Sequence, residues 1–225
     1  MQSLELIRAQ IEAACARTNR SPAEITLIGA SKTVEAARLE PFLEAGLCDF
    51  GENYVQEGIA KVRNFREQGL NATWHFIGAL QSNKAREAVA HFDSIHSVDR
   101  ASLAKELDKE ARKIGKIQRV LLQVNIGDES SKAGTSPQQL PALLKECAAL
   151  QNLKIEGLMS LPPYRENPES SRVFHHKLRE LRDSLASCHL PLASLSMGMS
   201  RDFEVAIEEG ATIVRIGTAL FGARS

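Results

Sequence analysis

The chain has 225 residues, 43% of them apolar and 25% charged, and its 28 Lys and Arg balance 28 Asp and Glu, so the formal net charge is zero. This length and composition suit a globular protein that buries a sizeable core without disulfides or metals. The charge balance excludes the strong basic field that steers proteins onto nucleic acid or anionic membranes. No uninterrupted apolar run is long enough to span a bilayer.

The N-terminal segment, residues 3–19, predicts an amphipathic helix within residues 1–20, because Leu4, Ile7, Ile11 and Ala14 recur at helical spacing. The segment lacks the apolar stretch of a signal peptide. Just beyond it, Ser21 and Pro22 predict a helical restart, with the serine as N-cap and the proline in the first position.

The four cysteines are far apart and form no CxxC pair; they occupy positions 15, 48, 147 and 188. This pattern argues against a disulfide framework and against a zinc site, so we expect no metal. We interpret the cysteines as small apolar fillers in a reducing compartment and expect a cytoplasmic protein.

From Ile25 onward, short β-rich runs alternate with longer helical ones. The eight predicted strands begin at Ile25, Cys48, Thr73, Ser94, Arg119, Leu153, Ser194 and Thr212. The helical runs between them include residues 34–46, 53–69, 101–115 and 136–150, and several close on a glycine, where a left-handed residue is expected.

Strands that alternate with helices predict parallel pairing, and eight such units between residues 25 and 222 match a (β/α)8 TIM barrel. A doubly wound open sheet is the alternative, weakened because no Gly-x-Gly-x-x-Gly follows the first strand. We predict one α/β domain over residues 1–225, with an additional N-terminal helix at 1–20 and the barrel at 25–222. The sequence of residues 161–171 predicts a loop.

Lys32 follows the first predicted strand, in the run Ala30-Ser31-Lys32-Thr33. Barrel proteins carry their functional groups at the C-terminal ends of the strands. A lysine there would point into the mouth of the barrel, where desolvation favours the neutral amine that attacks an aldehyde. A strand-end lysine that simply reaches water is the alternative.

The ends of the seventh and eighth strands suggest a phosphate site, which barrels commonly carry there. Gly198 and Gly217 allow backbone N–H groups close to an anion, and Ser200 and Thr218 add hydroxyl donors. Ser200 also precedes the helical run 201–210, whose N-terminus favours negative charge. A plain N-cap at Ser200 and a tight strand exit at Gly217–Thr218 would explain these residues without a ligand.

Arg215 lies on the eighth strand, in TIVRIG. An arginine inside a barrel needs an acceptor. A pyridine nitrogen, which would then stay unprotonated, is one candidate, and an internal salt bridge is the other. Elsewhere, we interpret His75 as a satisfied core histidine, and Lys84 with Arg86 as a solvated helix start or a small basic patch.

Seven motifs occur in the order IGASKT, FGENYVQE, WHFIGALQSNK, VNIGDESSKAG, GLMSLPP, LSMGMSRDFEVAI and VRIGTALFG. In these motifs the chain resembles the pyridoxal phosphate homeostasis protein family (the YggS/PROSC type), which shares its fold with the N-terminal barrel of alanine racemase. The motifs extend over nearly the whole chain and are together highly specific, although none is so alone.

The resemblance implies that the chain binds pyridoxal 5′-phosphate as a Schiff base on Lys32. It implies that Ser200, Gly217 and Thr218 hold the phosphate and that Arg215 faces the pyridine nitrogen. It also implies that Asn53 lies near the cofactor, where the residue alone would suggest a helix N-cap. In the VNIGDESSKAG motif, Lys132 stands where racemases carry an arginine. We hypothesise that Lys132 is a secondary aldehyde acceptor, a solvated loop lysine being the alternative.

The function that the resemblance implies is intracellular homeostasis and supply of pyridoxal 5′-phosphate without turnover, so no residue is assigned as catalytic. Apo forms of enzymes that use this cofactor are the expected partners, and we expect a monomer. An amino-acid racemase is the alternative, but racemisation needs a second base, supplied in racemases by a further domain that we expect this chain to lack. Tyr54 and Tyr164 are no evident replacement. A Schiff-base aldolase acting on a sugar phosphate would also fit Lys32 and the phosphate site.

Overall fold

The computed structural model describes residues 2–129, 133–187 and 190–222. Within these ranges, eight parallel strands close into a barrel in chain order, and the last strand pairs with the first. The strands are β1 (Thr26–Ala30), β2 (Asp49–Glu52), β3 (Thr73–Phe76), β4 (Ser94–Val98), β5 (Gln118–Val124), β6 (Leu153–Ser160), β7 (Ser194–Ser196) and β8 (Ile213–Ile216). Closure confirms the predicted (β/α)8 barrel and excludes the doubly wound sheet.

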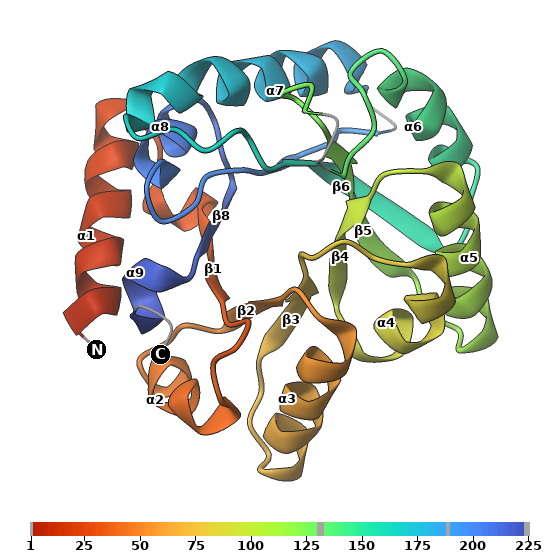
Figure 1. Cartoon of the computed structure of the whole chain (residues 1–225), viewed down its shortest axis with the longest axis horizontal. Helices are drawn as coiled ribbons and strands as arrows, with labels where there is room; N and C mark the ends of the chain where they lie inside the picture. Colours follow the sequence, from red (N-terminus) through yellow and green to blue (C-terminus); the bar gives the residue numbers. More distant parts are fainter. Residues whose placement is uncertain (1, 130–132, 188–189, 223–225) are drawn as a thin grey trace.

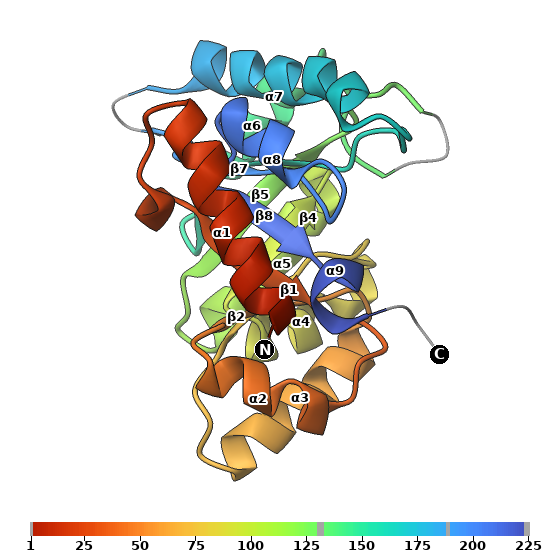
Figure 2. The ribbon, with the colours of Figure 1, turned by 90° about the vertical axis from the view of Figure 1, so that its left-hand side faces the viewer.

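Helices surround the barrel as an outer ring (Figure 1). They are α1 (Gln2–Arg17), α2 (Glu40–Glu44), α3 (Val55–Glu67), α4 (Ala85–His91), α5 (Ala101–Lys113), α6 (Leu140–Ala148), α7 (Arg172–Leu185), α8 (Phe203–Glu208) and α9 (Thr218–Phe221). The predicted N-terminal helix is α1, which lies against α8 and α9 (Figure 2) and buries its apolar stripe. In the described ranges, no helix is both long and apolar enough to cross a bilayer.

Proline determines where two of the helices begin. The predicted runs reach further toward the N-terminus than α2 and α6, which start at Glu40 and Leu140 and carry Pro41 and Pro141 in their first turns. Proline has no N–H to donate and suits the first turn but not the interior of a helix. Ser21 does cap a helical turn, in a capping box with Glu24, but that turn is the short 3-10 helix η1 (Pro22–Glu24).

The apolar residues of the barrel form two separate clusters. The larger cluster lies between the strands and the helices, and includes fully buried side chains such as Phe50, Phe65 and Phe92. The smaller cluster comprises Ile28, Leu121, Met159 and Ile213. Burial of each such side chain contributes roughly 1.5–3 kcal/mol to folding, so the scaffold around the mouth of the barrel is well supported.

The cysteine interpretation is right for two positions and wrong for one. Cys15 and Cys147 are buried, and burial raises the pKa of the Cys147 thiol to about 11, which suits an inert filler. Cys48 is exposed, because it precedes β2 at the surface of the barrel. Cys188 lies outside the described residues.

Candidate functional site

A cavity of about 1030 Å³ opens at the carboxyl ends of the strands. Its lining includes all six residues that the sequence nominated: Lys32, Asn53, Ser200, Arg215, Gly217 and Thr218. They come from four strand ends that are spread over most of the chain, and barrel closure brings them to one mouth. Lys132, the suggested secondary acceptor, lies outside the described residues.

Among the described residues that line this cavity, Lys32 is the one lysine, and its amine has no hydrogen-bond partner. It follows β1 in a tight turn and is half-buried. Within the described ranges, its side chain has no hydrogen bond or ion pair. The next residue, Thr33, has a positive φ of 65°. The amine is therefore neither sealed in the core nor neutralised by a carboxylate, and it faces a cavity that a small molecule can enter.

Arg215 is a buried cation at the edge of this cavity, with 3% of its surface exposed. Its guanidinium donates from Nη2 to the Ser160 carbonyl at 2.7 Å and from Nη1 to the Ser196 hydroxyl. In the part of the chain that the structure describes, no carboxylate pairs with it, so the salt-bridge interpretation is wrong. Burial lowers the pKa of Arg215 to about 10, and the negative charge of Asp202 offsets part of this decrease. Arg215 is therefore a cation at neutral pH.

A chain of hydrogen bonds runs from Arg215 through the barrel interior. Arginine can only donate, so the Ser196 hydroxyl accepts from it and donates to His96 Nδ1 at 3.1 Å. His96 Nε2 then donates to His75 Nδ1 at 3.1 Å, and His75 Nε2 donates to Asp49 at 2.9 Å. In this pattern each imidazole donates from Nε2 and accepts at Nδ1.

The electrostatics of His96 agree with that assignment. Burial above all, and then the neighbouring His75 and Arg215, hold the pKa of His96 well below its ordinary value. His75 is the satisfied core histidine that the sequence predicted, buried with both ring nitrogens bonded. The sequence analysis missed His96 and Ser196; the available signal was the run of polar residues in the buried strands β4 (SIHSV) and β7 (SLS).

Backbone donors gather at the end of the cavity formed by the segments after β7 and β8. Within the described ranges, the N–H groups of Ser200, Arg201 and Thr218 have no hydrogen-bond acceptor, and that of Ala219 has only the Ser200 hydroxyl at 3.5 Å. Unpaired N–H groups that converge on a cavity favour an anion. Gly198 makes the approach possible, because its φ is +89° and a Cβ there would lie 2.6 Å from the Ala206 side chain.

Ser200 is not a helix N-cap, contrary to one sequence interpretation. Helix α8 begins at Phe203, and Asp202 occupies the position before it. Asp202 accepts from the Met199 N–H at 2.8 Å and from His175 Nε2 at 2.9 Å. Burial raises the pKa of Asp202, but these bonds outweigh burial, so the net shift is downward. Asp202, which also lines the cavity, thus fixes the loop, and Ser200 lines the same cavity without acting as a cap.

Asn53 lies between β2 and α3 and is not an N-cap either, since Tyr54 occupies that position without a side-chain cap. Its side-chain amide has no partner among the described residues. Gly78 allows the end of β3 to approach it, because a Cβ at Gly78 would lie 2.1 Å from the Asn53 carbonyl oxygen. The amide is therefore available to a ligand in the cavity.

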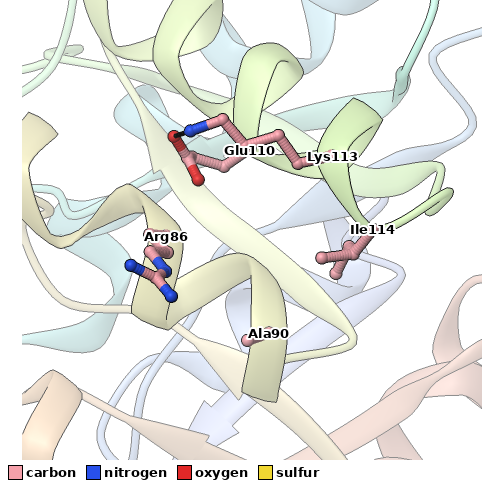
Figure 3. Close-up of a pocket in the computed structure, with 5 residues that line it drawn as sticks. All are labelled: Arg86, Ala90, Glu110, Lys113 and Ile114. Atoms are coloured by element: carbon pink, nitrogen blue, oxygen red, sulfur yellow. Dashed lines mark hydrogen bonds and ion pairs between the residues drawn. The ribbon is translucent and has the colours of Figure 1, made fainter.

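Lys84 and Arg86 do not form one basic patch. Lys84 pairs with Glu87 at 3.0 Å, which fits a solvated helix start. Arg86 instead lines a separate hollow of about 460 Å³ beside α4 and α5 (Figure 3). In that hollow, Lys113 pairs with Glu110 at 2.6 Å.

Comparison with known proteins first defines the class of fold. The profile of the family described as "Alanine racemase, N-terminal domain" matches residues 3–225. A solved alanine racemase from Clostridium difficile superposes with a TM-score of 0.73, covering 100% of this chain and 57% of the racemase, at 16% identity. At that identity the likeness concerns the fold alone.

Relatives of the same length then give the family. Proteins named pyridoxal phosphate homeostasis protein are 47% identical in Aquifex aeolicus, covering 99% of this chain and 97% of the relative, and 43% identical in Escherichia coli, covering 99% and 95%. The chain therefore belongs to the pyridoxal phosphate homeostasis protein family. PipY of Synechococcus elongatus, solved with PLP bound, is 39% identical with a TM-score of 0.81, covering 95% of this chain and 100% of PipY.

Proposed function

We propose that this protein binds pyridoxal 5′-phosphate in the cavity at the barrel mouth and serves intracellular supply and homeostasis of that cofactor without turnover of its own. The observation that carries the proposal is that one cavity gathers an uncommitted amine, a buried cation without a carboxylate and a group of unpaired N–H donors. An aldehyde, a pyridine nitrogen and a phosphate are the complementary groups.

The residues divide the cofactor among them. Ser200, Gly217 and Thr218 would hold the phosphate dianion, with charge-assisted bonds that are stronger than neutral ones. Arg215, a donor only, would hydrogen-bond an unprotonated ring nitrogen, and Asn53 would lie close by. When bound, pyridoxal 5′-phosphate supplies an aldehyde that a primary amine captures reversibly. The Lys32 amine would capture this aldehyde as a Schiff base, with release of one water.

Supply to other proteins fits an exposed site. Thr218 and Ala219 at the phosphate end are exposed, and Lys32 is only half-buried, so a bound cofactor could exchange with solvent or with another protein. We propose that the protein is a cytoplasmic monomer and that apo enzymes requiring the cofactor are its recipients. Size-exclusion chromatography with light scattering tests the monomer, and activation of an apo-transaminase by the loaded protein tests the transfer.

Amino-acid racemisation is the second candidate, favoured by the likeness to the alanine racemase barrel. It needs a base on each face of the substrate α-carbon, and Lys32 would supply one. In the described lining the tyrosine is Tyr164, which is 67% exposed and has the Arg201 guanidinium 5.0 Å above its ring. We expect no alanine racemisation near the roughly 10 s⁻¹ typical of enzymes; such a rate would establish the racemase instead.

The direct test of the proposal is borohydride reduction in the presence of pyridoxal 5′-phosphate, followed by mass spectrometry. We expect one pyridoxyl group, on Lys32, and none in the Lys32→Arg variant, which keeps the charge but cannot form a C=N bond. A label concentrated on another lysine, or no label, would refute the assignment. Trapping by a sugar phosphate but not by pyridoxal 5′-phosphate would favour the aldolase.

A further inference from the structure

A buried ionic cluster holds the turn that carries Lys32, and we define it as the Glu52–Glu57–Lys61 cluster. Lys61, on α3, has 6% of its side chain exposed, and Glu52, at the end of β2, has none. The Lys61 ammonium donates to Glu52 and to Glu57, both at 2.7 Å. Two carboxylates and one ammonium thus meet beneath the first strand end.

The cluster forms hydrogen bonds with the backbone on both sides of Lys32. On one side, the third bond of the Lys61 ammonium goes to the Ser31 carbonyl at 2.6 Å, and the Ser31 hydroxyl donates to Glu52 at 2.6 Å. On the other side, the Thr33 N–H donates to Glu57 at 2.5 Å. Lys32 itself takes no part in the cluster within the described residues.

These contacts give the two lysines opposite chemistry. The Lys61 side chain makes three hydrogen bonds at 2.6–2.7 Å, so it is fully engaged within the cluster. Within the described residues Lys61 pairs with both Glu52 and Glu57, and neither carboxylate pairs with Lys32. The cluster therefore leaves Lys32 as the amine that can react.

The turn also needs external support. Thr33 has a φ of +65°, a left-handed conformation that costs a β-branched residue energy. A strained residue persists only where its surroundings hold it, and the bond from the Thr33 N–H to Glu57 is the side-chain contact that does so here.

We propose that Glu57, held by Lys61, is a positioning residue that keeps the Lys32 turn in the conformation that presents its amine to an aldehyde. This inference rests on the proposed function, since it assigns a role toward the same ligand. It predicts that Glu57 affects covalent capture at Lys32 and leaves the recognition of phosphate and ring by the rest of the cavity unchanged.

The test compares Glu57→Ala with Glu57→Gln, because Glu57 is 28% exposed and its loss is tolerable, unlike that of buried Lys61. Glutamine keeps an oxygen for the Thr33 N–H; alanine does not. Glu67→Ala is the matched control, an exposed glutamate in the last turn of α3 without a hydrogen bond or ion pair in the described ranges. Each variant is assayed for the rate of borohydride-trapped label on Lys32 and for affinity for pyridoxine 5′-phosphate, which has no aldehyde.

We expect Glu57→Ala to slow trapping about fivefold to tenfold, as for loss of one charge-assisted bond, with wild-type affinity for pyridoxine 5′-phosphate. Glu57→Gln and Glu67→Ala should trap at close to the wild-type rate. Wild-type trapping in Glu57→Ala would overturn the inference, and so would an equal loss of pyridoxine 5′-phosphate affinity, which indicates general damage to the cavity. Absence of label on Lys32 in the wild type would instead overturn the proposed function itself.

Discussion

Ser196 stands between Arg215 and His96, and its single hydroxyl accepts a hydrogen bond from the guanidinium and donates one to the imidazole. The hydroxyl therefore orients the cation at the cavity and fixes the tautomer of the histidine behind it. All the bonds point in one direction, from Arg215 to Asp49, because only the last group is purely an acceptor. A break at Ser196 leaves buried polar groups unpaired on both sides.

The first prediction concerns that break. Ser196→Ala should lower the free energy of unfolding by about 1–3 kcal/mol, the cost of leaving buried polar groups unsatisfied. Ser97→Ala is the matched control, because the Ser97 hydroxyl is equally buried but has no partner in the described residues. Urea unfolding of both variants measures this free energy. Equal losses would show that the Ser196 bonds contribute nothing specific.

The second prediction follows from the lowered pKa of His96. Below about pH 6.5 the unfolded chain binds a proton at this histidine that the folded chain resists, so stability is full above that pH and falls as the pH drops. One such group contributes a slope of at most about 1.4 kcal/mol per pH unit. His96→Gln should flatten the fall in unfolding free energy between pH 6.5 and 4.5. Parallel curves for variant and wild type would contradict it.

The third prediction concerns the phosphate. Thr218→Val deletes a hydroxyl at the start of α9 and keeps the shape of the side chain, so pyridoxal 5′-phosphate should bind about tenfold more weakly, roughly 1.4 kcal/mol. Pyridoxal, which lacks the phosphate, should bind wild type and variant equally weakly. Equilibrium dialysis of both ligands provides the comparison. An equal affinity of the wild type for the two ligands would argue against a phosphate site at these donors.

The fourth prediction concerns the stability of the Glu52–Glu57–Lys61 cluster. Lys61→Met should destabilise the fold by about 3–5 kcal/mol, because it leaves the charge of Glu52 buried and uncompensated. Burial already raises the pKa of Glu52, although the positive charge of Lys61 lowers it in part. The double variant Lys61→Met/Glu52→Gln should recover part of that loss in urea unfolding. A double variant no more stable than Lys61→Met would place the cost elsewhere.

The sequence by itself determined the barrel, the positions of its strand ends and the six cavity residues. Those features are local: strands and helices alternate at a readable period, and in a parallel barrel each strand end reaches the same mouth. That rule made Lys32 and Gly217 candidates beside plain structural alternatives, whereas Asn53 came only from the resemblance of the motifs. The order of the motifs likewise predicted the family.

The tertiary structure alone decided what lies behind those residues. His96 and Ser196 are 100 residues apart in the chain, and Lys61 reaches Ser31 across 30 residues. No local pattern encodes such pairs, because closure of the barrel creates them. The same holds for Ser200 and Asn53, which local propensity placed as helix caps. In the folded chain Asp202 and Tyr54 occupy the cap positions, and both predicted caps line the cavity instead.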